Sequence, residues 1–140
     1  MAIAFDASSK GTDFGSTSSG TVAHTTSGSN RLMVVVVHTA TSANTVSSIT
    51  YNGVDFTTAG QGFIGGVTNG SRRTEFWYLL NPATGTNNVV VDVDATGLVA
   101  WSFSTATYTG VIQSSAIDVS GTAVAGDPMR VSLGTTVDNC

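Results

Sequence analysis

Hydrophobic and polar residues alternate along most of the chain in short runs, which are separated by residues that favour turns. Valine occupies every second position in residues 88–94, and apolar or aromatic side chains recur with the same period in residues 98–108. A period of two places one face of a β-strand in the core and the other outside it. No run has the spacing of an amphipathic helix of ordinary length. The expected strands are residues 3–5, 21–26, 31–40, 48–57 as a hairpin, 73–80, 88–94, 98–108 and 129–133, with residues 7–20 and 112–128 mostly as loop.

Two of these strands carry the strongest local signals. Asn52-Gly53 lies between two alternating runs, and Asn-Gly supplies the positive φ angles of a two-residue type I′ hairpin turn. Residues 31–40 contain four consecutive valines, which indicate a strand that is buried on both faces or central in its sheet.

Eight to nine short strands at this spacing predict an all-β fold, an antiparallel β-sandwich of the jelly-roll or Ig-like kind, in one domain spanning residues 1–140. The composition agrees with this prediction. Thr, Ser, Val and Gly fill 73 of the 140 positions, and β-branched Thr and Val favour strands over helices. A hydrophobic content of 41% argues against intrinsic disorder.

Charge excludes several function classes. The net charge is −4, and only 10% of the residues are charged, with Arg72-Arg73 as the one basic pair. A nucleic-acid interface needs a cationic patch, and attachment to anionic lipid needs a basic cluster, so we expect neither partner. The first residues lack a basic stretch followed by an apolar core, so we expect no signal peptide, and the longest apolar run is too short to span a bilayer.

The residues that usually carry catalysis are scarce. Glu75 is the only Glu, so paired acids for glycoside hydrolysis have no identifiable partner, and no Gly-x-Ser-x-Gly elbow is present. His24 and His38 are isolated in their segments, and Asp92 with Asp94 is typical of the solvent face of a strand. We therefore expect no catalytic residues, no metal site, no cofactor and no enzyme activity.

The aromatic strand 73–80 offers a candidate contact surface. Arg73, Glu75 and Trp77 alternate on one face, which we interpret as partly exposed, while residues 74, 76, 78 and 80 are expected to face the core. A Trp on such a face suits a subunit interface, or a platform for a sugar ring. Cys140, the single cysteine, is either a spare thiol at a truncation or an intermolecular tether.

A set of motifs in the second half of the chain resembles a known module. These are residues 72–82 (RRTEFWYLLNP), Gly85, residues 89–91 (VVV) and residues 108–111 (YTGV). Together they resemble a β-sandwich module found in phage structural proteins and bacterial surface proteins, over roughly residues 31–137. The resemblance implies packing or display, and it implies a further apolar strand after residues 135–139. A neighbouring chain would supply that strand; alternatively, the chain is truncated or the fold closes without it.

Two functions follow as expectations. The first is a non-enzymatic structural protein: a self-assembling or decoration subunit of a phage virion or an extracellular fibre, with protein partners and a homo-oligomeric state. The alternative is a carbohydrate-binding or adhesion module of a secreted bacterial surface protein, with a glycan as partner. Both place the protein in a virion or outside the cell.

Overall fold

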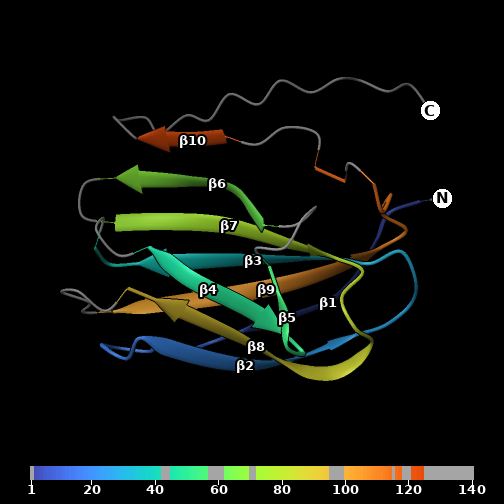
Figure 1. The fold of residues 1–140 in the computed structure, drawn as a ribbon, viewed down its shortest axis with the longest axis horizontal. Coiled ribbons are helices and arrows are strands. Elements are labelled where there is room, and N and C mark those ends of the chain that lie inside the picture. The colour runs from blue at the N-terminus through green and yellow to red at the C-terminus, as the bar shows by residue number, and fades with distance from the viewer. Residues whose placement is uncertain are drawn as a thin grey trace.

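The computed structural model describes residues 2–41, 45–56, 62–69, 72–94, 100–114, 116–117 and 121–124, and these residues contain strands without any helix (Figure 1). The strands are β1 (Ala4–Lys10), β2 (Ser19–Thr26), β3 (Leu32–Thr39), β4 (Val46–Tyr51), β5 (Val54–Asp55), β6 (Gly62–Asn69), β7 (Arg72–Leu80), β8 (Gly85–Val93), β9 (Trp101–Thr109) and β10 (Gly121–Val124). Across the described ranges, no helix is long and apolar enough to cross a membrane.

The strands form two sheets that lie face to face. Sheet A has the order β1-β9-β3-β7-β6-β10, and sheet B has the order β2-β8-β4-β5 (Figure 1). All neighbours within them are antiparallel except β10, which runs parallel to β6. The predicted all-β sandwich is confirmed, with one parallel edge pair that the alternation pattern did not indicate.

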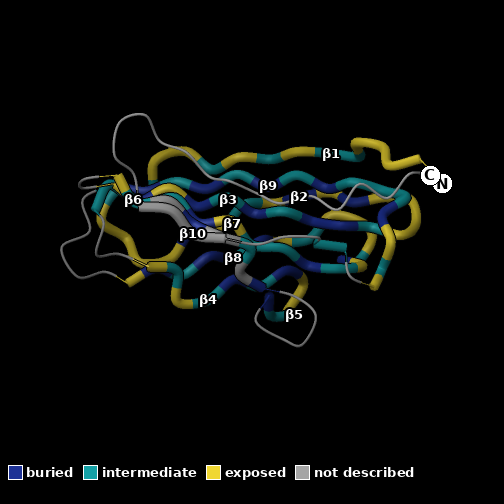
Figure 2. Tube along the Cα trace, turned by 90° about the horizontal axis from the view of Figure 1, so that it is seen from above, coloured by how far each residue is buried: buried dark blue, intermediate teal, exposed yellow. Residues whose placement is uncertain are grey.

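The core fills the space between the sheets, where the buried residues of both layers lie (Figure 2). Strand β3 is central in sheet A, between β9 and β7, as the valine run indicated. Its burial nevertheless alternates, because Val35 and Val37 point into the core while Val34 and Val36 are only half-buried on the outer face. The core consists of Met33, Val35, Val37, Ile49, Tyr51, Phe56, Leu79, Val89, Val91, Val93, Trp101 and Phe103.

The boundaries of the first two strands differ from the prediction. Residues 7–20 were expected to be loop, but β1 continues to Lys10 and β2 begins at Ser19. Pairing explains the extension, because Ser8–Lys10 are in register with Ser104–Ala106 of β9. A Ser-rich segment adopts a strand here because a neighbouring strand satisfies its backbone, which local composition does not reveal.

The predicted hairpin is confirmed. Tyr51 of β4 pairs with Val54 of β5, and the intervening Asn52 and Gly53 have φ angles of 49° and 74°. Two positive φ angles are what a type I′ turn requires. The expected strand 129–133, the segment 135–140 with Cys140, and the implied further strand lie outside the described residues.

Candidate functional site

The face of β7 that points into the sandwich is the opposite of the predicted one. Arg73, Glu75, Trp77 and Leu79 point inward, and Phe76 lies on the outer face, 38% exposed. The register with β3 is the reason, since these four inward residues pair with Thr39, Val37, Val35 and Met33, which also point inward. The prediction was wrong because it assigned charged side chains to solvent, whereas here they are satisfied by partners inside the fold.

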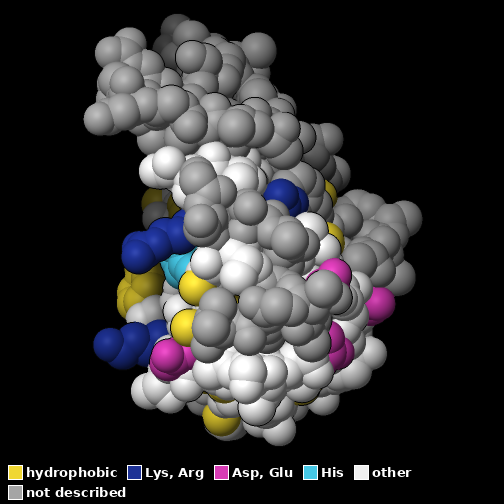
Figure 3. Space-filling model, turned by 90° about the vertical axis from the view of Figure 1, so that its left-hand side faces the viewer, with side chains coloured by type: hydrophobic (Ala, Val, Ile, Leu, Met, Phe, Trp, Pro, Cys, Tyr) yellow, Lys and Arg dark blue, Asp and Glu magenta, His cyan; other side chains and the backbone are white. Residues whose placement is uncertain are grey.

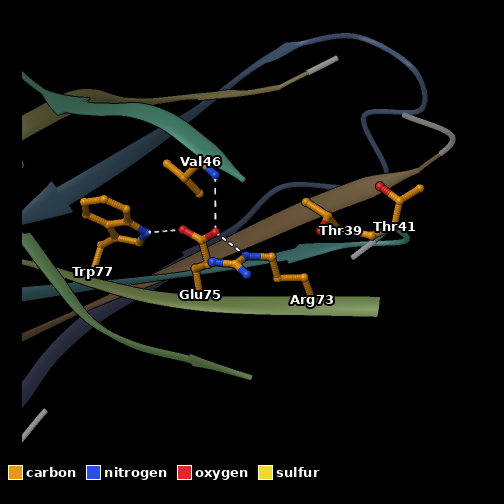
Figure 4. Close-up of polar contacts among 6 residues, drawn as sticks. All are labelled: Thr39, Thr41, Val46, Arg73, Glu75 and Trp77. Carbon is orange, nitrogen blue, oxygen red and sulfur yellow. Dashed lines mark hydrogen bonds and ion pairs between the residues drawn. The ribbon is translucent and has the colours of Figure 1, made fainter. Parts of the chain in front are cut away.

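The Glu75 carboxylate is the centre of these contacts (Figure 4). The side chain is only 4% exposed. Oε1 accepts a hydrogen bond of 2.6 Å from Nε of Arg73, with which it forms an ion pair, and a longer one of 3.4 Å from the backbone amide of Val46. Oε2 accepts a hydrogen bond of 3.0 Å from the indole Nε1 of Trp77. Because Val46 belongs to β4, this one carboxylate connects sheet A to sheet B.

The structure thus brings three of the four predicted contact residues together, but inside the sandwich. The ring of Trp77 packs against the core, and its N–H is directed at Glu75. A sugar ring stacks on an exposed aromatic face, whereas Trp77 is partly buried and its indole N–H already has an acceptor. Arg73, Glu75 and Trp77 therefore form a polar bridge centred on the buried Glu75, with Arg73 and Trp77 partly buried, and Cys140 lies outside the described residues.

A different apolar surface is exposed on the opposite side of sheet A. In β3, Val34 pairs with Tyr78 and Ala106, and the next outward residue, Val36, pairs with Phe76. Together these residues form a strip that crosses β9, β3 and β7. We call this surface the outer apolar face; its residues are Phe5, Val34, Val36, Phe76, Tyr78, Ala106 and Tyr108.

The outer apolar face is hollowed rather than flat. A groove of about 570 Å³ runs over it, lined by Val34, Val36 and Tyr108 together with polar residues of β1 and β9. The Phe5 ring, 62% exposed, meets the Tyr108 ring edge to face at a centroid distance of 6.1 Å. The sequence did not reveal this surface, because the four consecutive valines indicated a strand that is buried on both faces or central in its sheet, and neither alternative predicts a partly exposed outer face. Burial alternates along the four valines, but identical side chains give no sign of this in the sequence. Only the register with the neighbouring strands reveals which valines face outward.

Basic residues border the outer apolar face at one end. Lys10 at the end of β1 and Arg72 at the start of β7 are both exposed. His38 lies on the same face, with its Nδ1 2.9 Å from Oγ1 of Thr74. Near them, Asp13 accepts a hydrogen bond of 2.8 Å from a loop amide, and a cleft of about 350 Å³ opens between Asp13, His38 and Arg72.

The outer face of sheet B has a different chemistry. Its strands present hydroxyl and amide side chains, with the hydroxyl oxygens of Thr25 and Thr86 2.7 Å apart. Asp92 near the end of β8 accepts a hydrogen bond of 2.7 Å from the hydroxyl of Ser48. Asp94, the first residue after β8, is exposed. The outer face of sheet B is therefore polar, with acidic residues at one end.

A second buried polar bridge joins the sheets at β2. His24 is 1% exposed, and its ring nitrogens lie 3.0 Å from the Ser9 hydroxyl and 2.6 Å from the Thr107 hydroxyl. Burial lowers the pKa of the imidazole from its usual 6.5, and the negative charge of Asp6 opposes part of that shift. A satisfied neutral histidine in this position supports the packing of β2 against β1 and β9.

Among the described residues, no group of three or more His, Cys, Asp or Glu side chains is arranged to hold a metal ion. Comparison of the chain with protein-family models found no matching family, and comparisons with curated proteins and with solved structures found no match.

Proposed function

We propose that the protein is a non-enzymatic structural subunit that assembles with other copies of itself, in a phage particle or an extracellular fibre. The observation that carries this proposal is the outer apolar face, where aromatic and aliphatic side chains lie in adjacent rows on a regular sheet. The setting in a particle or fibre comes from the resemblance of residues 72–82 and 108–111 to phage and surface-protein modules.

Contiguity is what distinguishes this surface from ordinary exposed apolar residues. Single apolar side chains on a surface are common, whereas a continuous patch of several marks a binding surface. Burial of one Phe or Val side chain contributes about 1.5–3 kcal/mol. Phe5 and Phe76 are exposed and would gain the most on association, and the half-buried Val34 and Val36 would add smaller amounts.

The glycan-binding alternative has weaker support. It depended on an exposed Trp77, and the indole of Trp77 is engaged by Glu75 and packed against the core. The outer apolar face offers aromatic rings at Phe5 and Tyr108, but these contact each other edge to face. We therefore retain protein assembly as the proposed function.

The experiment is to measure mass against concentration, from micromolar to millimolar, by light scattering and sedimentation velocity. We expect the wild type to form oligomers, and Phe76→Ser combined with Val36→Thr to shift the assembly midpoint at least tenfold upward. The control is Ile112→Ser, which removes an apolar side chain that is 72% exposed but lies beyond the end of β9. A wild type that stays monomeric throughout would overturn the proposal, as would an equal effect of Ile112→Ser.

A further inference from the structure

We propose that assembly is head to tail: the outer apolar face of sheet A in one copy packs on the outer face of sheet B in the next copy. The inference rests on the proposed self-assembly and adds which two surfaces meet. The partner is a second copy of this chain, and the argument is charge complementarity between the two faces.

The charges of the two faces lie at the same end of the sandwich. Arg72 is next to Arg73 of β7, and Arg73 pairs with Thr39 of β3. On its other side, Thr39 pairs with Trp101 of β9. The indole of Trp101 donates a hydrogen bond of 2.6 Å to the carbonyl of Thr17 in the β1–β2 connection. Strand β2 begins two residues after Thr17, at Ser19, and Ser19 pairs with Asp92 of β8. The basic end of sheet A and the acidic end of sheet B therefore share one end of the molecule.

Figure 3 looks directly at this end. Most of the visible Lys and Arg side chains and a His lie beside an apolar patch on one side of the view, and most of the visible acidic side chains lie on the other. By their strands, Lys10, His38 and Arg72 belong to sheet A, whereas Asp92 belongs to β8 of sheet B and Asp94 follows the end of that strand. At this end, sheet A therefore carries mostly basic residues and sheet B carries acidic ones. Asp13 is an exception, since it lies near the basic residues.

Stacking copies in the same orientation brings opposite charges together. If one copy is translated along the normal of its sheets, its Lys10 and Arg72 meet Asp92 and Asp94 of the copy behind. A two-fold pairing of two sheet A faces would have no such match, because each partner would present the same basic residues. Face-to-face sheets in proteins commonly pack about 10 Å apart with their strand directions within about 30° of each other.

The face of sheet A approaches the size of a stable contact. The five antiparallel strands of sheet A, about 4.8 Å apart and about eight residues long at about 3.3 Å per residue, cover a flat face of roughly 600 Å². Protruding side chains make the accessible area larger, and a standard interface removes about 800 Å² from each partner. Threonine methyl groups, with Ala23 and Val90, give the outer face of sheet B apolar contact area as well.

In a head-to-tail stack, the copy at one end has a free sheet A face and the copy at the other end has a free sheet B face, so a further copy can add at either end. Such a heterologous interface generates a filament, or a ring if the rotation between copies closes. A two-fold contact would stop at the dimer. Head-to-tail packing therefore predicts assemblies that grow beyond two copies.

The experiment uses two variants with complementary defects. The basic-end variant carries Lys10→Glu and Arg72→Glu, and the acidic-end variant carries Asp92→Lys and Asp94→Lys. We expect each alone to be monomeric at a concentration where the wild type forms larger species in sedimentation velocity and negative-stain electron microscopy. Mixed in equal amounts they should assemble again with the two variants alternating, because the two unchanged faces carry opposite charges and so do the two reversed faces.

Combining all four substitutions reverses both ends and should restore assembly, and circular dichroism should confirm that every variant is folded. Assembly of the acidic-end variant alone at wild-type concentrations, or failure of the mixture to assemble, would overturn the head-to-tail pairing and leave self-assembly standing. A monomeric wild type would overturn the proposed function itself, so the two failures are distinguishable.

Discussion

The indole N–H of Trp77 donates a hydrogen bond of 3.0 Å to the carboxylate of Glu75, two residues earlier on the same inward face of β7. Both side chains thereby become part of the interior, and the same carboxylate reaches Arg73 on its own strand and the amide of Val46 on the other sheet. A buried charge is tolerated when hydrogen bonds and an opposite charge surround it, and Glu75 meets that condition.

The first prediction concerns the removal of this carboxylate. Glu75→Ala leaves the guanidinium of Arg73 and the indole N–H of Trp77 without their acceptor, so we expect a loss of about 2–4 kcal/mol in the free energy of unfolding. Chemical denaturation at pH 7 measures it. The exposed Lys10 is the control, since Lys10→Ala should change the free energy by no more than about 0.5 kcal/mol. Equal losses in the two variants would contradict the bridging role of Glu75.

The second prediction concerns the pH dependence of stability. His24 has a lowered pKa in the fold, so the unfolded state takes up a proton first as the pH falls below about 6.5. Stability is therefore fully present above that pH and is lost as the pH falls toward the folded pKa, with a slope of up to about 1.4 kcal/mol per pH unit.

Denaturation curves between pH 5 and pH 8 measure that slope. His24→Gln should be less stable throughout, because the contacts with Ser9 and Thr107 change, but it should lose the slope below pH 6.5. His38→Gln, on the outer face, should keep it. Asp6→Asn should extend the slope to lower pH, because the Asp6 charge raises the pKa of His24 in the fold. An unchanged slope in His24→Gln would refute the assignment.

The third prediction separates backbone strain from crowding at two glycines. Gly53 has a φ of 74° and open space where a Cβ would lie, so Gly53→Ala should cost about 1–2 kcal/mol from strain alone. A Cβ on Gly20 would lie 2.8 Å from the rings of Phe14 and Trp101, so Gly20→Ala should cost about 1–3 kcal/mol from overpacking. Thermal unfolding measures both. Gly53→Asn, which tolerates positive φ, should recover part of the loss, and the absence of any recovery would argue against the turn assignment.

The alternation of residues 88–94 and the Asn52-Gly53 turn allowed the sandwich and one hairpin to be predicted, because both signals are local. The sequence could not predict in the same way which side chains of β7 point into the core. Arg73 and Glu75 indicated solvent by residue type, and only the register with Val37 and Thr39 of β3, which are distant in sequence, places them inside.

The candidate surface was missed for a related reason. In the run Val34–Val37 both faces of the strand carry the same residue, so the sequence contains no alternation from which exposure can be inferred. The pairing of Val36 with Phe76 and Ser104 assigns it to the outer face. The bridge between His24 and Thr107 joins residues 83 positions apart, and no spacing motif connects them.

The last prediction tests the facing of β7 directly, through two apolar residues three positions apart. Leu79 is 1% exposed in the core, so Leu79→Ala should cost about 2–5 kcal/mol from lost burial and the cavity left behind. Phe76 is on the outer face, so Phe76→Ser should change the free energy of unfolding of the monomer by less than about 1 kcal/mol while weakening assembly. Urea denaturation at a concentration below the assembly midpoint isolates the monomer, and sedimentation velocity above it measures association. If Phe76 faced the core as the sequence pattern suggested, the two substitutions would destabilise the monomer to a similar extent.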